Sequence, residues 1–266
     1  MHRVTLPDIG LGTWENTNPA TCAASVSEAL TIGYRFIDTA QAYRNEAHVG
    51  RGIAQAEVQR EQIIVGTKVW RSNLSYSKVL KSTDVSLQKL GLDFVDILYI
   101  HWPSGSYNPE KTLHAFSELA DQGKITHIAV SNFTIDLLEE AIEVCDNPII
   151  ANQVEMHPLL KQKEMLQFLE DHDMYLIAYS PLARGHIFEI PELTEIAKKH
   201  NVSEAQVSLA WLMTHENVIP IPKATSNQHI EDNYKALQLT LDSEDMEKIE
   251  SIQIERRIVN PPFALW

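Results

Sequence analysis

The chain has 266 residues, of which 44% are hydrophobic, and its formal net charge is −14. This is an ordinary globular composition with enough chain for a sizeable core. The acidic balance repels polyanions, so it argues against nucleic acid or an anionic membrane surface as a partner.

Two cysteines, Cys22 and Cys145, lie far apart in the sequence, and no Cys/His spacing typical of a metal site is present. Two free thiols are typical of a reducing compartment. Residues 1–7 contain no apolar signal-peptide core, and no run of about 18 apolar residues is long enough to span a membrane. We therefore expect a cytoplasmic protein without a metal, and a monomer, because no sustained apolar surface stripe is evident.

Along the chain, short runs rich in Ile, Val and Tyr alternate with longer amphipathic segments. Continuous apolar runs are typical of parallel strands that are buried on both faces. We predict strands at residues 9–14, 35–38, 63–69, 94–100, 126–130, 149–153, 174–179 and 218–221. We predict helices at residues 19–31, 46–56, 76–90, 109–122, 135–145, 162–172, 191–200, 203–215, 228–236 and 241–252.

Eight strand–helix pairs make up a (β/α)8 barrel, a fold that commonly needs about 250 residues. No linker, low-complexity tract or charge block divides the chain, so we expect a single domain over residues 1–266. The alternative is a doubly wound open sheet, which usually carries GxGxxG after its first strand when it binds a dinucleotide. Here only Gly10-x-Gly12 is present, and this favours the barrel.

The carboxyl ends of barrel strands meet on one face, where the active site lies. Polar side chains stand at or just after these predicted ends, and Tyr43 follows the second strand in a loop. The strand-end residues are Asp38, Lys68, His101, Ser131, Asn132, Gln153, Tyr179 and Lys223. Each one alone is explained by a turn, a cap or a core position, but together they indicate a shared site.

Four of these residues fit carbonyl reduction by hydride transfer, in which the substrate oxygen must gain a proton. Tyr43 can give that proton, and a nearby Lys68 ammonium would stabilise the phenolate and lower the pKa of the phenol. Asp38 would keep a partly buried Lys68 charged, and His101 would orient the carbonyl oxygen. We predict that these four residues are catalytic.

Seven motifs, in order and at compatible spacing, resemble the aldo-keto reductase family over essentially the whole chain. They are GYRFIDTA at 33–40, VGTKVW at 65–70, DILYIHWP at 96–103, IAVSNF at 128–133, NQVEMHP at 152–158, AYSPL at 178–182 and IPIPK at 219–223. The resemblance implies a (β/α)8 barrel, a carbonyl reductase that binds NADPH before its substrate, and the same four catalytic residues. The chain is most similar to short bacterial members such as 2,5-diketo-D-gluconic acid reductases and methylglyoxal reductases.

The resemblance also implies which residues contact the cofactor and the substrate. Those it assigns to the nicotinamide are Ser131, Asn132, Gln153 and Tyr179. Those it assigns to the pyrophosphate and the adenosine 2′-phosphate are Ser180, Leu182, Lys223, Thr225 and His229, and it assigns Asn233 to the adenine. Those it assigns to the substrate pocket are Trp14, Trp70 and Trp102.

The chain departs from the family pattern in three places. His229 stands where an arginine commonly grips the 2′-phosphate, and it lacks the bidentate fork, so NADH remains possible beside NADPH. The amino-terminal hairpin is cut to residues 3–8. The loop at residues 103–109 and the carboxyl-terminal tail are also short, which predicts an open pocket for small dicarbonyls and keto sugars.

Two other functions use the same barrel. A Schiff-base aldolase would use Lys68 as its nucleophile, with Asp38 and Tyr43 transferring protons. Under that hypothesis the set Ser131, Asn132, Gln153 and Tyr179 has no role. A cofactor-sensing subunit of a larger assembly would bind NADPH without turnover.

Overall fold

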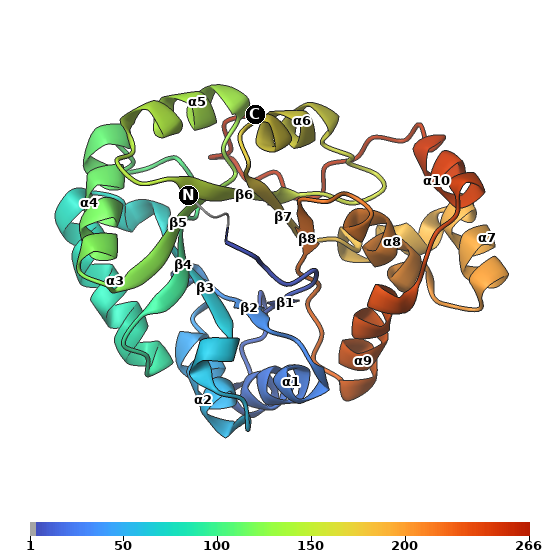
Figure 1. Cartoon of the computed structure of the whole chain (residues 1–266), viewed down its shortest axis with the longest axis horizontal. Coiled ribbons are helices and arrows are strands. Elements are labelled where there is room, and N and C mark those ends of the chain that lie inside the picture. Colours follow the sequence, from blue (N-terminus) through green and yellow to red (C-terminus); the bar gives the residue numbers. More distant parts are fainter. Residues whose placement is uncertain (1–3) are drawn as a thin grey trace.

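The computed structural model describes residues 4–266, so residues 1–3 of the predicted domain and the start of the predicted hairpin remnant lie outside the described residues. Eight strands form one parallel sheet in sequential order, from β1 (Leu11–Gly12) to β8 (Val218–Pro220). Helices surround the strands on the outside (Figure 1). The predicted (β/α)8 barrel is confirmed.

Most predicted elements agree with the structure to within one or two residues at each end. The strands between the first and last are β2 (Phe36–Asp38), β3 (Ile64–Val69), β4 (Val95–Ile100), β5 (Ile125–Ser131), β6 (Ile149–Glu155) and β7 (Tyr175–Tyr179). The helices are α1 (Pro19–Ile32), α2 (Glu46–Gln55), α3 (Tyr76–Leu90), α4 (Pro109–Asp121), α5 (Ile135–Val144), α6 (Lys163–Asp171), α7 (Pro191–His200), α8 (Glu204–Met213), α9 (Asn227–Lys235) and α10 (Ser243–Glu250). Short 3₁₀ turns include η1 (Gln41–Tyr43), η3 (Arg71–Asn73) and η4 (Ala183–Glu189).

The first strand is much shorter than the predicted span of residues 9–14, because only Leu11 and Gly12 pair regularly with β2. Gly12 closes the barrel: its N–H donates to the Pro222 carbonyl at 3.0 Å, and it pairs in parallel with Lys223. A Cβ at Gly12 would lie 2.6 Å from the Ile221 carbonyl oxygen. Gly12 is therefore not part of a dinucleotide-binding motif. Its lack of a side chain allows the first strand to approach the segment after the last strand closely.

Capping side chains explain where several helices begin. Asn18 caps α1 and accepts hydrogen bonds from the backbone N–H groups of Ala20 and Thr21. Ser203 and Gln206 form a capping box at the start of α8. These local signals place each helix after its strand, so that the strand ends remain on one face.

Alternating strand residues fill the interior of the barrel, and the opposite residues pack against the helices. The buried interior side chains include Phe36, Ile97, Tyr99, Ala129, Ala151, Ile177 and Ile219. This apolar filling closes the lower barrel, so a cavity can form only beyond the strand ends.

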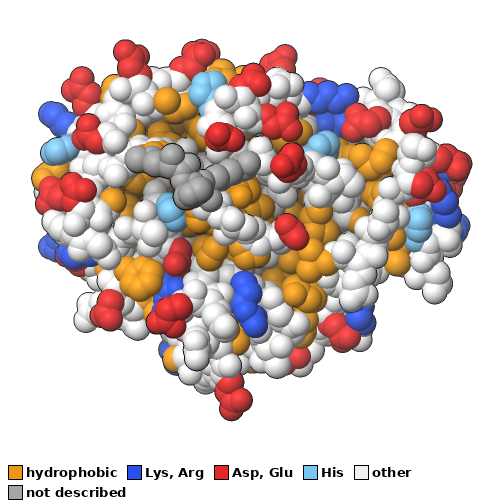
Figure 2. All heavy atoms as spheres, in the orientation of Figure 1, with side chains coloured by type: hydrophobic (Ala, Val, Ile, Leu, Met, Phe, Trp, Pro, Cys, Tyr) orange, Lys and Arg blue, Asp and Glu red, His pale blue; other side chains and the backbone are white. Residues whose placement is uncertain are grey.

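Acidic side chains are spread widely over the face shown in Figure 2, and lysines and arginines are fewer. This agrees with the net charge of −14. Within residues 4–266, none of the helices combines the length and the apolar character that crossing a membrane requires.

Candidate active site

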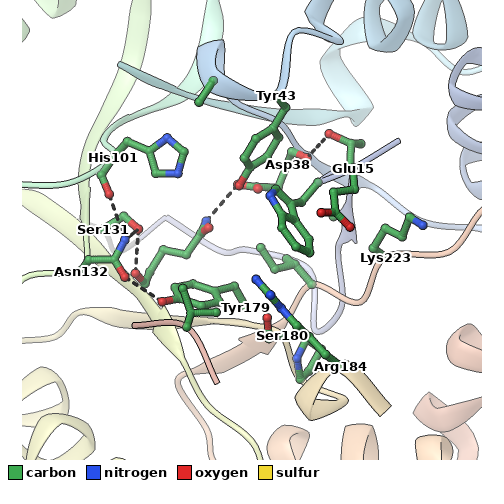
Figure 3. Close-up of a pocket in the computed structure, with 18 of the residues that line it drawn as sticks. Glu15, Asp38, Tyr43, His101, Ser131, Asn132, Tyr179, Ser180, Arg184 and Lys223 are labelled. Carbon is green, nitrogen blue, oxygen red and sulfur yellow. Dashed lines mark hydrogen bonds between the residues drawn. The ribbon is translucent and has the colours of Figure 1, made fainter. Parts of the chain in front are cut away.

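A cavity of about 680 Å³ opens at the carboxyl ends of the strands (Figure 3). It brings together most of the residues that the sequence assigns to a site. Those lining it are Trp14, Asp38, Tyr43, Trp70, His101, Trp102, Ser131, Asn132, Gln153, Tyr179, Ser180, Leu182 and Lys223. Residues from eight separate strand ends and loops thus meet in one place, as the barrel predicts.

Asp38 and Lys68 form a buried ion pair at the base of the cavity. Lys68 Nζ contacts Asp38 Oδ1 and also donates to the Thr39 carbonyl at 2.9 Å, and both charged side chains are almost fully buried. Gln153 Nε2 donates to the other carboxylate oxygen, Oδ2, at 2.9 Å. Asp38 lines the cavity, whereas Lys68 does not. A buried ion pair can hold a fixed geometry when further hydrogen bonds satisfy both of its charged groups.

Tyr43 lies above this pair, at the end of the η1 turn. The turn folds back after β2, so that Lys68 Nζ is 5.1 Å from the centroid of the Tyr43 ring. The His101 ring lies 5.6 Å from the Tyr43 ring, edge to face. The predicted group of Asp38, Tyr43, Lys68 and His101 is therefore a physical cluster.

The pKa of Tyr43 differs from the sequence expectation. Burial, followed by the charge of Asp38 and then by Tyr179, raises the pKa of Tyr43 well above its ordinary value of 10. The expected lowering by Lys68 is wrong in this structure. The reason is that burial of the phenol, the largest cause, and the negative charge of Asp38 both raise its pKa and outweigh any lowering by Lys68. Tyr43 is accordingly a neutral phenol that holds its proton.

His101 is also neutral at pH 7. Burial, with a smaller contribution from the Lys68 charge, lowers its pKa well below 6.5. Its ring is edge-on to Trp70 at 5.2 Å, and within the described part of the chain its Nδ1 has no hydrogen-bond partner. A neutral imidazole at this place can donate one hydrogen bond to a ligand in the cavity.

The side of the cavity near His101 is lined by buried polar side chains. Ser131 Oγ donates to the Gln153 carbonyl at 2.8 Å, and Asn132 Nδ2 donates to the His101 carbonyl at 2.9 Å. The Tyr179 hydroxyl donates to Asn132 Oδ1 at 2.9 Å, as Figure 3 shows. These bonds lock the rotamers of the side chains that the sequence assigns to the nicotinamide.

Cations lie on the opposite side of the cavity. Lys223 follows β8, and Arg184 lies on η4 near Ser180 (Figure 3). The Arg184 guanidinium is 4.2 Å from the centroid of the Trp14 ring. Sequence reasoning missed Arg184 and the neighbouring Glu15, because neither belongs to a motif and only the fold brings them to the cavity.

Three residues assigned to the adenosine end lie outside this cavity lining. Thr225 and His229 are exposed, on the segment that leads into and begins α9. Asn233, further along α9, is buried. Both exposed residues follow Lys223 in the sequence.

The carboxyl-terminal tail reaches the cavity even though it is short. Val259, Pro261 and Phe263 line it. The Phe263 ring lies 5.9 Å from Trp70 and 5.2 Å from Trp102, edge to face in both cases. The brief tail was expected to leave the pocket open; instead it supplies part of an aromatic wall, because its last residues are apolar and fold back onto the two tryptophans.

Glu155 anchors this tail. Its carboxylate accepts hydrogen bonds from the backbone N–H groups of Ile258 at 2.6 Å and Val259 at 2.8 Å, and from His157 Nε2 at 2.8 Å. Burial opposes its ionisation, but these hydrogen bonds prevail and lower the pKa of Glu155. Glu155, at the end of β6, therefore holds the tail at Ile258 and Val259.

Glu155→Gln is expected to loosen the tail, because the new amide N–H₂ faces a backbone donor and loses a charged hydrogen bond. Loss of a hydrogen bond to a charged group costs about 1.5–3 kcal/mol, so trypsin cleavage after Arg256 or Arg257 should speed up by about tenfold or more. Timed digestion followed by mass spectrometry measures this. Glu164→Gln, an exposed position on α6, is the matched control. Equal cleavage in both variants would remove Glu155 from this role.

Residues 8–254 match the model of the Aldo/keto reductase family. The chain belongs to this family, which confirms the resemblance inferred from the motifs. Its class of activity is that of an oxidoreductase that reduces carbonyl groups, and the family uses nicotinamide cofactors.

Named relatives make the similarity more specific. The chain is 40% identical over 261 residues to methylglyoxal reductase DkgB of Escherichia coli O157:H7, covering 97% of each. It is 39% identical over 262 residues to glyoxal reductase of Bacillus subtilis (strain 168), covering 98% of this chain and 94% of the relative. A solved structure named for 2,5-diketo-D-gluconic acid reductase B superposes with a TM-score of 0.93 at 36% identity, covering 97% and 92% of the two chains. All three carry the names of reductases, so neither the aldolase nor the sensor alternative is favoured.

Proposed function

We propose that this protein reduces small aldehydes and ketones, dicarbonyls above all, with NADPH as the preferred reductant and Tyr43 as the proton donor. The observation that carries the proposal is the protonated, buried phenol of Tyr43, held between the Lys68–Asp38 pair and the neutral imidazole of His101. Tyr43 also lines the cavity, and a phenol placed there can give its proton to a substrate oxygen.

The residues of the cavity fit a nicotinamide dinucleotide. The buried hydroxyl and amide groups of Ser131, Asn132 and Gln153 suit a carboxamide, which both donates and accepts hydrogen bonds. Across the cavity, Arg184 and Lys223 supply positive charge for phosphate groups (Figure 3). The polar side of the cavity matches the nicotinamide of such a cofactor, and the cationic side matches its phosphate groups.

The chain's own side chains then divide the work. When bound, a reduced nicotinamide supplies the hydride. His101 donates a hydrogen bond to the substrate oxygen and orients the carbonyl. Tyr43 transfers its phenolic proton to that oxygen, and the resulting phenolate faces Lys68 at short range. Asp38 holds Lys68 in place and favours its charged form before Tyr43 has given up its proton.

Two observations support the substrate class: the side chains that line the cavity and the names of the similar proteins. The tryptophans and Phe263 form an aromatic wall beside His101, and the relatives named above are a methylglyoxal reductase and a glyoxal reductase. A compact dicarbonyl fits between this wall and the polar floor. The test is a panel of methylglyoxal, glyoxal, a keto sugar and an aromatic aldehyde with NADPH, followed as loss of absorbance by the reduced nicotinamide. The proposal requires the dicarbonyls to have the highest kcat/KM.

The preference for NADPH rests on the region after β8. Lys223, Thr225 and the amino-terminal end of α9, which Ser226 caps by accepting from the backbone N–H of His229, favour a phosphate group. His229 itself lacks the bidentate fork of an arginine. We therefore propose a preference for NADPH that is moderate, with NADH also accepted.

His229→Arg is expected to tighten NADPH binding by about tenfold and NADH binding by much less, because a guanidinium adds a charge-assisted contact to a 2′-phosphate only. Fluorescence titration of both reduced cofactors measures this. His172→Arg, at an exposed position after α6, makes the same chemical change elsewhere. A similar gain for both cofactors in His229→Arg would place His229 away from the 2′-phosphate.

The two alternatives predict different results with the same reagents. A Schiff-base nucleophile must be unprotonated and reach the substrate, whereas Lys68 is buried, is paired with Asp38 and does not line the cavity. Borohydride trapping of a carbonyl compound on Lys68 without NADPH binding would support the aldolase. Tight NADPH binding without turnover of any carbonyl would support the sensor.

We also propose that the chain forms a single domain, acts as a monomer and resides in the cytoplasm. One continuous barrel accounts for the described residues, and both cysteines are free thiols, one of them buried. Free thiols suit a reducing compartment. Size-exclusion chromatography with light scattering tests the monomer.

A further inference from the structure

A second groove lies on the other side of the Trp70 wall. It has a volume of about 800 Å³ and runs between α3 and the turns η1 and η3. Ala42 and Trp70 line both this groove and the active-site cavity, so the two spaces share a wall. The established family activity assigns no role to this groove.

The groove carries four positive side chains, Arg44, Lys78, Lys81 and Lys89, and no Asp or Glu among the described residues that line it. The lysines come from one face of α3, spaced at three and eight residues. Four of the chain's 22 lysines and arginines thus gather in one place on a protein with a net charge of −14. Such a local reversal of sign focuses the field and attracts anions.

Most of this charge is not neutralised by the protein. Among residues 4–266, Arg44 and Lys81 make no ion pair, and Lys78 donates only to the Ser72 carbonyl, at 3.2 Å. Lys89 lies 3.8 Å from the Glu46 carboxylate, which is buried and also accepts from Thr67 Oγ1. At least three cations are therefore free to meet a ligand.

Hydrogen bonds of the Gln41 side chain hold the floor of the groove in place. The Gln41 side chain donates to the Ser82 carbonyl and to Ser86 Oγ, both at 3.2 Å. Its Oε1 accepts from the backbone N–H of Trp70 and from Asn73 Nδ2, both at 3.1 Å. One amide thus ties α3 to η3 and to the η1 turn that carries Tyr43. The cationic face of α3 is held at a fixed position relative to the reaction centre.

We propose that this groove is a subsite for the distal anionic group, a carboxylate or a phosphate, of an extended carbonyl substrate whose reactive carbon lies beside Tyr43. The inference rests on the proposed reductase function. Trp70 lies between the two spaces: its ring is 5.2 Å from the His101 ring, and the same residue lines the groove. Three unpaired cations bind a mono- or dianion mainly through charge, so the subsite selects charge rather than one particular molecule.

The test compares straight-chain aldehydes of five to eight carbons that end in a carboxylate, in a phosphate, or in the neutral methyl ester of the carboxylate. For the wild-type protein with NADPH we expect kcat/KM for the anionic aldehydes to exceed that for the ester. In Lys78→Glu/Lys81→Glu we expect the anionic kcat/KM to fall by about tenfold or more, mainly through KM, with the ester changed by less than about twofold. The phosphate and carboxylate arms show which anion the groove prefers.

A matched double variant controls for net charge. Lys111→Glu/Lys198→Glu makes the same change at exposed lysines on α4 and α7, neither of which lines the groove. Equal losses in both double variants would assign the effect to the overall field and overturn the subsite. Equal losses of kcat/KM for the acid and its ester would show that the groove residues have a structural role only. That result would also overturn the subsite.

A binding measurement separates this inference from the reductase proposal. Calorimetric titration of the NADP⁺-saturated protein with a five- to eight-carbon dicarboxylate should give heat that Lys78→Glu/Lys81→Glu loses and the control variant keeps. Retained binding without reduction of any aldehyde would refute the proposed function and support the groove as an anion site. Turnover of the ester without dicarboxylate binding or discrimination of the acid would refute the groove alone.

Discussion

Tyr43→Phe is expected to lower kcat for carbonyl reduction by about 10²–10⁴-fold, the usual contribution of a positioned general acid. The phenyl ring keeps the edge contact with His101 and the packing above Lys68, so only the proton is lost. Affinity for NADPH should therefore change little. Steady-state kinetics with methylglyoxal, together with fluorescence titration of NADPH, measure the two effects separately.

A second tyrosine provides the control for this variant. Tyr76→Phe removes a hydroxyl that donates to Glu118 on α4, outside the cavity. It should retain nearly full turnover. If Tyr43→Phe instead kept its kcat and lost cofactor affinity, Tyr43 would be a binding residue and another group would have to supply the proton.

Lys68→Met is expected to have the largest effect on stability. It leaves the Asp38 carboxylate buried without its counter-charge, and breaking a buried pair in this way costs roughly 3–5 kcal/mol. The free energy of unfolding, from urea titration monitored by circular dichroism, should fall by that amount. Turnover should also fall, because the phenolate of Tyr43 would face Asp38 without the neutralising ammonium.

The double variant Lys68→Met/Asp38→Asn tests the cause. It removes both charges, so it should recover much of the lost stability while remaining inactive. The single variant should also recover part of its stability at acid pH. A buried, unpaired carboxyl has a raised pKa in the folded state, so its destabilising effect is absent below its unfolded pKa and grows as the pH rises through the folded pKa. A stability loss that is the same at pH 5 and pH 8 in the single variant would contradict this account.

Periodicity and composition were enough to predict the architecture. Continuous apolar runs between amphipathic segments imply parallel strands covered by helices, and eight such pairs in this length imply a barrel. Most predicted helix ends agree with the structure to within one or two positions. The first strand was predicted too long, because a run such as 9–14 does not reveal where its hydrogen-bonding partners stop.

The position of a residue relative to its strand was likewise readable from the sequence. Asp38, Lys68 and His101 stand at or just after strand ends, and the topology of a barrel brings such ends together. This is why the four-residue cluster could be assigned before any distance was known. Residues outside motifs, such as Arg184 and Phe263, reach the cavity through loop and tail conformations that have no local sequence signature.

By itself, then, the sequence determined the barrel, the family and the set of polar side chains at its mouth, because these depend on period, spacing and strand order. Only the tertiary structure decided that burial and Asp38 raise the pKa of Tyr43, since that balance depends on distances in three dimensions. It also decided that Glu155 draws the tail over the tryptophans, and that the lysines of α3 face a groove behind Trp70. Charge, burial and contact between distant segments are properties of the packed molecule, and they govern how the residues named by the sequence work together.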